Sequence, residues 1–182
     1  MKLIIDGVLQ NLDIAILDKD NKVIYSDRTK QNKNLSEILV NKVEESFVKS
    51  NTKINDIKDI YIVNGPGSFT SLKLISIFAN TWKQEKNINL FTINTCLWNS
   101  RHDNSILWFD AKSDKIFYSK INSENENLVE ICDKKWFENN IKILDNVYEL
   151  DEEQDIKTKI TSQINNFKSV NIIVPNYIKE AL

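Results

Sequence analysis

The sequence predicts an α/β protein of two lobes, each built on a mixed sheet with flanking helices. Short apolar runs of strand length alternate along the chain with longer stretches of helical period. A strand, a tight turn and a helix follow one another over residues 57–83. The polar run 101–104 separates two groups of elements, so we expect a first lobe over residues 1–100 and a smaller, shortened lobe over residues 101–182.

The first lobe opens with three predicted strands in succession. These are the apolar runs 2–6, 12–17 and 22–25, and the turn-forming residues 18–21 join the last two. Short turns between consecutive strands predict an antiparallel meander. A helix is predicted over residues 33–50, because apolar side chains recur there at steps of three and four residues. The side chains of this stripe are Leu35, Ile38, Leu39, Val43 and Phe47.

One turn holds two of the three Gly residues and one of the two Pro residues of the chain. The preceding residues 57–63 are mostly β-branched or aromatic, as in a buried strand, and Gly65-Pro66-Gly67 stops that strand. We expect Gly65 or Gly67 to occupy a backbone region closed to other residues. Ser68 or Thr70 is suited to cap the next helix. The segment is therefore either a tight turn with a helix cap or an anion site at the helix start.

The helix predicted over residues 68–83 is apolar on more than one side. Such a helix must be covered twice, once by its own sheet and once by either the second lobe or a partner subunit. The sequence leaves both alternatives open. One line of apolar side chains and a second group beside it make up this surface: Leu72, Ile75, Ala79 and Trp82, then Leu74, Ile77 and Phe78.

The remainder of the chain contains further predicted elements. Apolar runs predict strands at 89–93, 106–110, 116–121, 128–131 and 170–174, with weaker candidates at 141–144 and 147–148. Helices are predicted at 133–139 and 151–167, and a helix or a crossover begins at 95–100.

Composition excludes several classes of protein. Hydrophobic residues make up 41% and charged residues 27% of the 182 residues, as in ordinary globular proteins. The net charge of −2 gives no global basis for binding nucleic acid or an anionic membrane. No apolar run approaches the roughly 20 residues of a membrane span, and the N-terminus is charged too early for a signal peptide. Cys96 and Cys132 fit reduced cytosolic thiols and lack metal spacing, so we expect a cytoplasmic protein.

The turn sequence is specific enough to point to a family. The hexapeptide of Gly65, Pro66, Gly67, Ser68, Phe69 and Thr70 resembles the turn of the TsaB (YeaZ) family. Ser71-Leu72-Lys73 then departs mildly from the usual Gly-Leu-Arg. Weaker resemblances are Asp110-Ala111-Lys112, similar to an Asp-Ala-Arg hairpin, and Pro175-Asn176-Tyr177, similar to a terminal Pro-x-Tyr.

The resemblance implies an actin-like or RNase H-like (ASKHA) fold and a non-catalytic role. It implies a scaffold and activator subunit of the complex that makes threonylcarbamoyladenosine (t6A) in tRNA, a subunit that binds and stabilises the catalytic TsaD subunit. A TsaE-like ATPase would join through the complex, tRNA would be contacted only indirectly, and the chain alone would form a homodimer. ATP and metal would belong to the partner subunits, so we expect no cofactor on this chain.

By the same resemblance, the predicted helices 33–50 and 68–83 lie side by side and form the interface with TsaD. An apolar centre with a charged rim would suit such a contact. The expected interface residues are Leu35, Ile38, Leu39, Lys42, Val43, Leu72, Ile75, Phe78, Ala79 and Trp82.

The resemblance also locates a vestigial phosphate site at Asp6 and Asp110. Active members of the superfamily grip phosphate and metal there, with hydroxyl residues after the first Asp and a Gly-rich turn near the second. In this chain Asp6 is followed by no hydroxyl, and the turn 112–115 contains no Gly. The only His, His102, lies in a predicted loop, so we expect no catalytic residue and no metal site. The alternative is a stand-alone ATP-binding transferase or peptidase-like enzyme of the superfamily.

Overall fold

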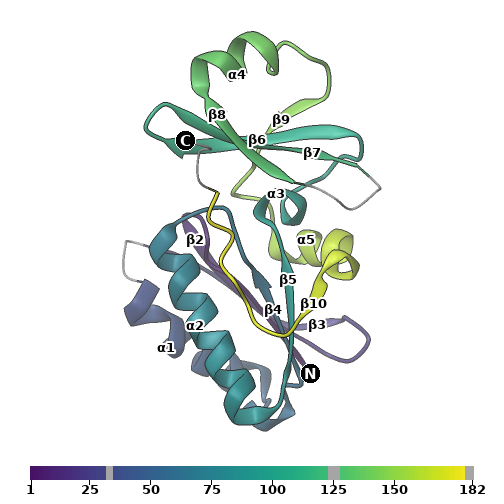
Figure 1. The fold of residues 1–182 in the computed structure, drawn as a ribbon. Coiled ribbons are helices and arrows are strands. Elements are labelled where there is room, and N and C mark those ends of the chain that lie inside the picture. The colour runs from purple at the N-terminus through teal and green to yellow at the C-terminus, as the bar shows by residue number, and fades with distance from the viewer. Residues whose placement is uncertain (32–34, 123–127, 179–182) are drawn as a thin grey trace.

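The computed structural model describes residues 1–31, 35–122 and 128–178, and it has two lobes (Figure 1). In chain order, the described elements are β1 (Lys2–Asp6), β2 (Asn11–Leu17), β3 (Val23–Lys30), α1 (Leu35–Ser50), the short 3-10 helix η1 (Ile54–Asp56), β4 (Asp59–Val63), α2 (Phe69–Lys86), β5 (Asn89–Ile93), α3 (Thr95–Trp98), β6 (Ser105–Lys112), β7 (Lys115–Ile121), β8 (Val129–Asp133), α4 (Lys134–Asn140), β9 (Val147–Glu149), α5 (Ile156–Gln163), η2 (Ile164–Asn166) and β10 (Lys168–Val170).

Each lobe contains one mixed sheet. The first has six strands in the order β10-β5-β4-β1-β2-β3, and the second has four in the order β8-β7-β6-β9. In the first sheet β1, β4 and β5 run parallel, while β2, β3 and β10 are antiparallel to their neighbours. The predicted class, α/β with two mixed sheets and flanking helices, is therefore confirmed.

The predicted N-terminal meander is present as β1, β2 and β3. Its first pair places Ile5 opposite Ile14, and both side chains are buried. In the turn after β2, the Asp18 carboxylate accepts hydrogen bonds from the backbone N–H groups of Asp20 and Lys22, at 2.8 and 2.9 Å. A side chain that bonds the backbone two residues on is typical of Asp in turns, and it fixes this hairpin.

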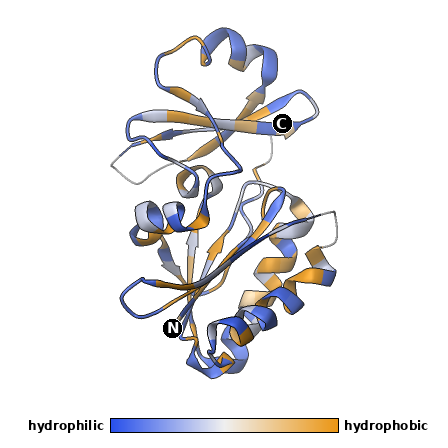
Figure 2. Ribbon diagram, turned by 180° about the vertical axis from the view of Figure 1, so that it is seen from behind, coloured by the Kyte–Doolittle hydropathy of each residue, from blue (hydrophilic) through white to orange (hydrophobic). Residues whose placement is uncertain are grey.

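The six-stranded sheet is covered on both faces (Figure 1). Because successive strand residues point to opposite faces, Leu3 and Ile5 pack beneath α1 and α2, while Ile4 faces α3 and α5. Along α1 and α2, hydrophobic positions alternate with hydrophilic ones, as Figure 2 shows from behind. Burial of one stripe of each helix thus forms the core of the first lobe.

The second lobe has a small core of its own. One face of the β6–β7 hairpin packs against α4, with Phe137 only 1% exposed between Trp108 and Tyr118. The ring centroids lie 5.4 and 5.7 Å from that of Phe137, within the usual range of aromatic pairs.

The C-terminal part of the chain returns to the first lobe. Strand β10 pairs with β5 at the sheet edge, and α5 packs against α3. After β10, Ile173 inserts into the first core, and the Asn80 side chain both donates to its carbonyl and accepts from its N–H, at 2.9 and 2.8 Å. The expected lobe boundary at residue 101 therefore separates the two sheets, while residues from 156 onward contribute to the first lobe.

Some predicted boundaries differ from the structure. Residues 141–144 form a turn rather than a strand, and the helix expected over 151–167 begins only at Ile156, where Asp155 caps it. The last strand lies at Lys168–Val170 instead of 170–174. The start of the first helix, expected at residue 33, lies outside the described residues. No helix within the described ranges has the length and apolar character needed to cross a membrane.

Candidate functional site

The turn between β4 and α2 is fastened to the turn that follows β1. The backbone N–H of Ser68 donates to the Val8 carbonyl at 2.8 Å. A Cβ atom built on Gly67 would lie only 2.4 Å from that same carbonyl oxygen. Gly65 has φ +111°, which confirms that this turn uses a conformation closed to other residues. The two glycines are thus required for different reasons, one for close approach and one for its backbone angle.

The polar groups at the start of α2 find hydrogen-bond partners within the protein. Ser68 is the N-cap, since its hydroxyl accepts from the Ser71 N–H at 3.4 Å, whereas Thr70 is exposed on the helix. The Pro66 carbonyl accepts from the Thr95 hydroxyl at 2.7 Å. Phe69 stacks on Tyr177, with ring centroids 4.6 Å apart. Of the two alternatives for this segment, these contacts favour the tight turn with a helix cap.

Asp6 lies in a buried cluster of charges. Its carboxylate accepts from the Trp98 indole N–H at 2.8 Å, and the Lys159 ammonium of α5 lies 3.7 Å away. Lys159 also lies 3.9 Å from Asp13, and Arg28 makes two hydrogen bonds to Asp13, at 2.6 and 2.7 Å. Asp6, Asp13 and Lys159 are each no more than 6% exposed. Two carboxylates and two cations therefore balance one another inside the first lobe.

Burial controls the protonation of this cluster. Removal from water raises the pKa of Asp6 above its usual value, the Lys159 charge lowers it, and the Asp13 charge raises it again. The hydrogen bonds to Asp13 raise the pKa of Arg28. The Lys159 ammonium thus offsets the buried negative charge of Asp6.

Sequence reasoning missed Asp13, Arg28 and Lys159. The available signals were a carboxylate at the second position of the otherwise apolar run 12–17 and a lysine on the same helical face as Ile156 and Ile160. Both are charged residues at positions that the alternation of the strand or the turn of the helix places among buried apolar side chains. Buried charges are nearly always paired, so each predicts a partner of opposite charge.

Asp110 lies apart from Asp6, at the end of the β6–β7 hairpin. Its carboxylate accepts from the backbone N–H and the ammonium of Lys112, and these hydrogen bonds lower its pKa. Asp110 lines a cleft of about 500 Å³ between the lobes, together with Glu149 and Glu152, whereas Asp6 is not among the lining residues. The two Asp residues thus do not line this cleft together, and its three carboxylates outnumber its one cation, Lys112.

The hairpin turn beside Asp110 keeps a left-handed backbone without glycine. Lys112, Ser113 and Asp114 have φ values of 69°, 51° and 59°. We expect Ser113→Gly to raise the free energy of unfolding by about 0.5–1 kcal/mol, because glycine removes the Cβ strain of this conformation. Urea unfolding checks this. The matched change Ser36→Gly in exposed α1 should lower stability instead. A loss of stability in both variants would contradict the expectation.

Helices α1 and α2 lie side by side on one face of the first sheet (Figure 1). Six of the expected interface residues are at most 5% exposed, and five of them belong to the core beneath these helices, whereas Leu72 joins the core on the other face of the sheet. The six are buried because most of the regular stripe read from the sequence covers the sheet. These six residues are Leu35, Leu39, Val43, Leu72, Ile75 and Ala79.

A groove of about 350 Å³ runs between the outer sides of the two helices. Phe78 and Trp82 of α2 and Phe47 of α1 line it, and the Trp82 ring packs against both phenyl rings, with centroids 5.2 and 6.1 Å apart. Val40 and Ile54 border the groove with 49% and 42% of their surface exposed. Of the other expected interface residues, Ile38 is half-buried, and Lys42 makes ion pairs with Glu45 and Asp27.

The remaining candidate groups do not form a reactive site in the described residues. His102 lies in a loop and stacks on Tyr148, with centroids 4.5 Å apart. Cys96 is buried, which raises the pKa of its thiol, and Cys132 is half-buried. Within the described ranges, no group of three or more His, Cys, Asp or Glu side chains is placed to hold a metal ion.

The two mixed sheets and their flanking helices define the chain as a two-lobed α/β protein. The solved structure "YeaZ from Pseudomonas aeruginosa" superposes with a TM-score of 0.63 over 72% of this chain and 66% of that chain, at 11% sequence identity. The family model "TsaD: tRNA N6-adenosine threonylcarbamoyltransferase" matches residues 23–179. The chain belongs to this family, which is related to the t6A modification of tRNA, and the expected resemblance to YeaZ is confirmed in its fold.

Two curated relatives come from mycoplasmas. The "Uncharacterized protein MG208 homolog" of Mycoplasma pneumoniae is 33% identical over 96 residues, which are 52% of this chain and 49% of the relative. "Uncharacterized protein MG208" of Mycoplasma genitalium is 29% identical over 128 residues, 68% of this chain and 65% of the relative. The matches thus span between half and two thirds of the relatives' own lengths.

Proposed function

We propose that this chain is a scaffold and activator subunit of the t6A modification complex, and that it binds a catalytic TsaD-like subunit through the outer surface of α1 and α2. The observation that carries the proposal is the aromatic groove between these two helices. In this role the chain works in the cytoplasm and supplies no catalytic residue. ATP and metal belong to the partners, among them a TsaE-like ATPase, and tRNA is contacted only indirectly.

The groove has the composition of a protein interface. Its floor is formed by half-buried aromatic side chains, and partly exposed aliphatic residues border it. Aromatic anchors surrounded by apolar contacts contribute most of the affinity in typical interfaces. The apolar face of a helix from TsaD would fill this groove, and in its absence a second copy of the chain would cover it as a homodimer.

The interior of the first lobe supports a non-catalytic role. Lys159 occupies the space beside Asp6, and the interlobe cleft presents Asp110, Glu149 and Glu152. A phosphate in that cleft would meet these three carboxylates against one ammonium group, that of Lys112, which already pairs with Asp110. These charges argue against the alternative of a stand-alone ATP-binding transferase or peptidase-like enzyme.

Charge substitutions in the groove test the interface. We expect Val40→Glu and Ile54→Glu each to weaken binding to the TsaD subunit by at least about 10-fold, because a carboxylate would be desolvated without a partner. Both residues are partly exposed, so the fold should tolerate the changes. Calorimetric titration measures the affinity, and reconstituted tRNA modification should fall in parallel.

Ile143→Glu is the matched control, since Ile143 is 73% exposed on the second lobe, away from the groove. It should bind the TsaD subunit as the unchanged protein does. If both groove variants were folded and bound as tightly as this control, the proposed interface would be wrong.

A further inference from the structure

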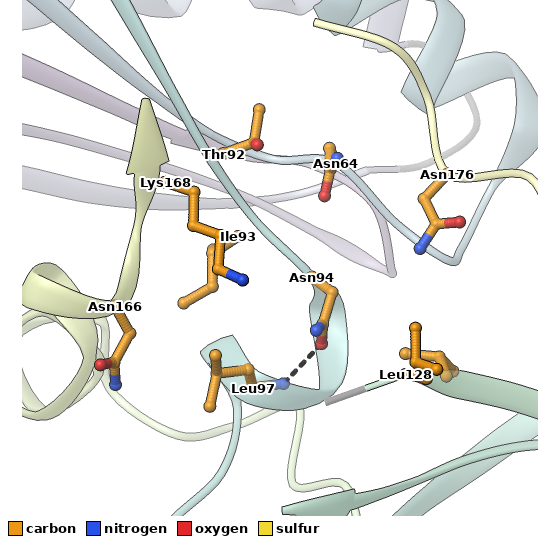
Figure 3. A pocket seen from close by; sticks show the side chains of 10 residues that line it. Asn64, Thr92, Ile93, Asn94, Leu97, Leu128, Asn166, Lys168 and Asn176 are labelled. Carbon is orange, nitrogen blue, oxygen red and sulfur yellow. Dashed lines mark hydrogen bonds between the residues drawn. The ribbon is translucent and has the colours of Figure 1, made fainter. Parts of the chain in front are cut away.

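A third hollow, distinct from the groove and from the cleft lined by Asp110, lies beyond the carboxyl ends of β4 and β5. It encloses about 500 Å³ and is shown in Figure 3. In open α/β sheets, ligands bind outside the carboxyl ends of parallel strands, and a volume of about 300–1,000 Å³ is usual for a small-molecule site. Both location and size therefore match a ligand site.

The wall of this pocket is rich in amide groups. Four Asn side chains surround it, and Thr92 and Lys168 add a hydroxyl and an ammonium group. Among the described residues that line it, none carries a carboxylate, in contrast to the interlobe cleft. Such a wall suits a ligand with several hydrogen-bonding groups and a negative charge. The four amides belong to Asn64, Asn94, Asn166 and Asn176.

Strand pairing places the charged and hydroxyl groups together. Lys168 of β10 is the cross-strand partner of Thr92 in β5, so both side chains project from the same face of the sheet. Figure 3 shows the Lys168 side chain extending over Ile93 into the space below Asn64. An anionic group bound near Lys168 would therefore also lie near the amides.

The amides are held in place by bonds within the protein. The Asn94 Oδ1 atom accepts from the Leu97 N–H at 2.8 Å, and Asn166 Nδ2 donates to the Gln163 Oε1 at 2.7 Å. The Asn64 side chain donates to the Val174 carbonyl at 3.5 Å, and the backbone of Asn176 is fixed by its N–H, which donates to the Asn64 carbonyl at 2.7 Å. Side chains fixed before binding lose little entropy on contact with a ligand. Leu97 and Leu128 add apolar surface to the wall.

We propose that this pocket binds a phosphorylated sugar, either alone or as part of a nucleotide. The phosphate lies at Lys168, the sugar hydroxyls exchange hydrogen bonds with the Asn amides and Thr92, and the apolar side accepts the carbon skeleton or a base. None of these residues lines the α1–α2 groove, so the proposal stands or fails independently of the proposed interface.

Calorimetric titration of the full chain with four probes tests the site: ribose 5-phosphate, ribose, inorganic phosphate and uridine 5′-monophosphate. We expect ribose 5-phosphate to bind, with ribose and inorganic phosphate each at least about 10-fold weaker, because each lacks half of the contacts. Tighter binding of the nucleotide than of ribose 5-phosphate would assign a nucleotide, and equal binding would assign a sugar phosphate.

Variants locate the binding in this pocket. Lys168→Gln should weaken ribose 5-phosphate by about 10-fold and leave ribose unchanged, whereas Thr92→Val should weaken both. Lys58→Gln, the same charge change at an exposed site outside the pocket, should have no effect. Absence of saturable binding of both phosphorylated probes up to about 5 mM would overturn the proposal. Equal affinity of ribose 5-phosphate for Lys168→Gln and the unchanged protein would also overturn it.

Discussion

Lys159→Met is expected to destabilise the protein by about 3–5 kcal/mol at pH 7, the largest effect of any single change considered. Methionine fills a similar volume but removes the ammonium that lies 3.7 Å from Asp6 and 3.9 Å from Asp13. Asp6 would then be a buried carboxylate whose charge is offset only by hydrogen bonds from Trp98 and Val8. Urea unfolding at constant temperature measures the loss.

The same substitution should make stability depend on pH in a defined direction. Burial already raises the pKa of Asp6 above 3.8, and loss of the Lys159 charge raises it further. The folded state then keeps a proton that the unfolded state has released, so stability falls as pH rises from the unfolded pKa through the folded one. The difference between Lys159→Met and the unchanged protein should therefore be smaller near pH 4 than at pH 7.

The double variant Asp6→Asn/Lys159→Met is the control, because it removes both charges and keeps the shapes of the two side chains. It should recover a large part of the stability that the single change loses, and it should lose the pH dependence. Equal stability of the single and double variants at pH 7 would show that Lys159 acts through packing alone.

Gly67→Ala is expected to cost about 2–4 kcal/mol, the second largest effect, because the new methyl group would lie against the Val8 backbone. The oxygen is only 2.4 Å from the Cβ position and already accepts from the Ser68 N–H. To relieve the contact, the turn must move away from the segment after β1 and lose that hydrogen bond. Thermal unfolding measures the change.

Gly7→Ala is a suitable comparison. A Cβ at Gly7 would meet the Ile75 Cδ1 atom at 2.9 Å, which is the end of a flexible side chain and is able to rotate away. Its cost should be about half that of Gly67→Ala or less. The interpretation of Gly67 as a close-contact position would be wrong if the two substitutions had equal effects.

Much of the fold follows from local pattern. The meander, the strand β4 and the helix α2 were all predicted, because apolar period and turn residues agree along these segments. Residues 141–144 were assigned a strand from apolar content alone, but Ile143 and Leu144 are 73% and 50% exposed, so no sheet buries them. The last helix was predicted too long, since a run of polar residues does not reveal that Asp155 is its cap.

The candidate sites depended on contacts between distant segments, which a local pattern does not contain. Lys159 meets Asp6 across 153 positions only because α5 returns to the first lobe. The exposure of the expected interface residues also depends on the folded lobe. Most of the regular apolar stripe of α1 and α2 faces the sheet, and the aromatic groove arises at its border, where Phe47 of α1 comes to lie beside Trp82 of α2 in the folded lobe.

The return of the chain to the first lobe also affects how the protein folds during synthesis. Strands β1 to β5 leave the ribosome well before β10, so the outer edge of β5 has no neighbour until residues 168–170 emerge. An unpaired strand edge is a template for association with other chains. Over the same interval the nascent lobe holds Asp6 and Asp13 without Lys159, so completion of its sheet and neutralisation of its interior both await the synthesis of residues 159–170.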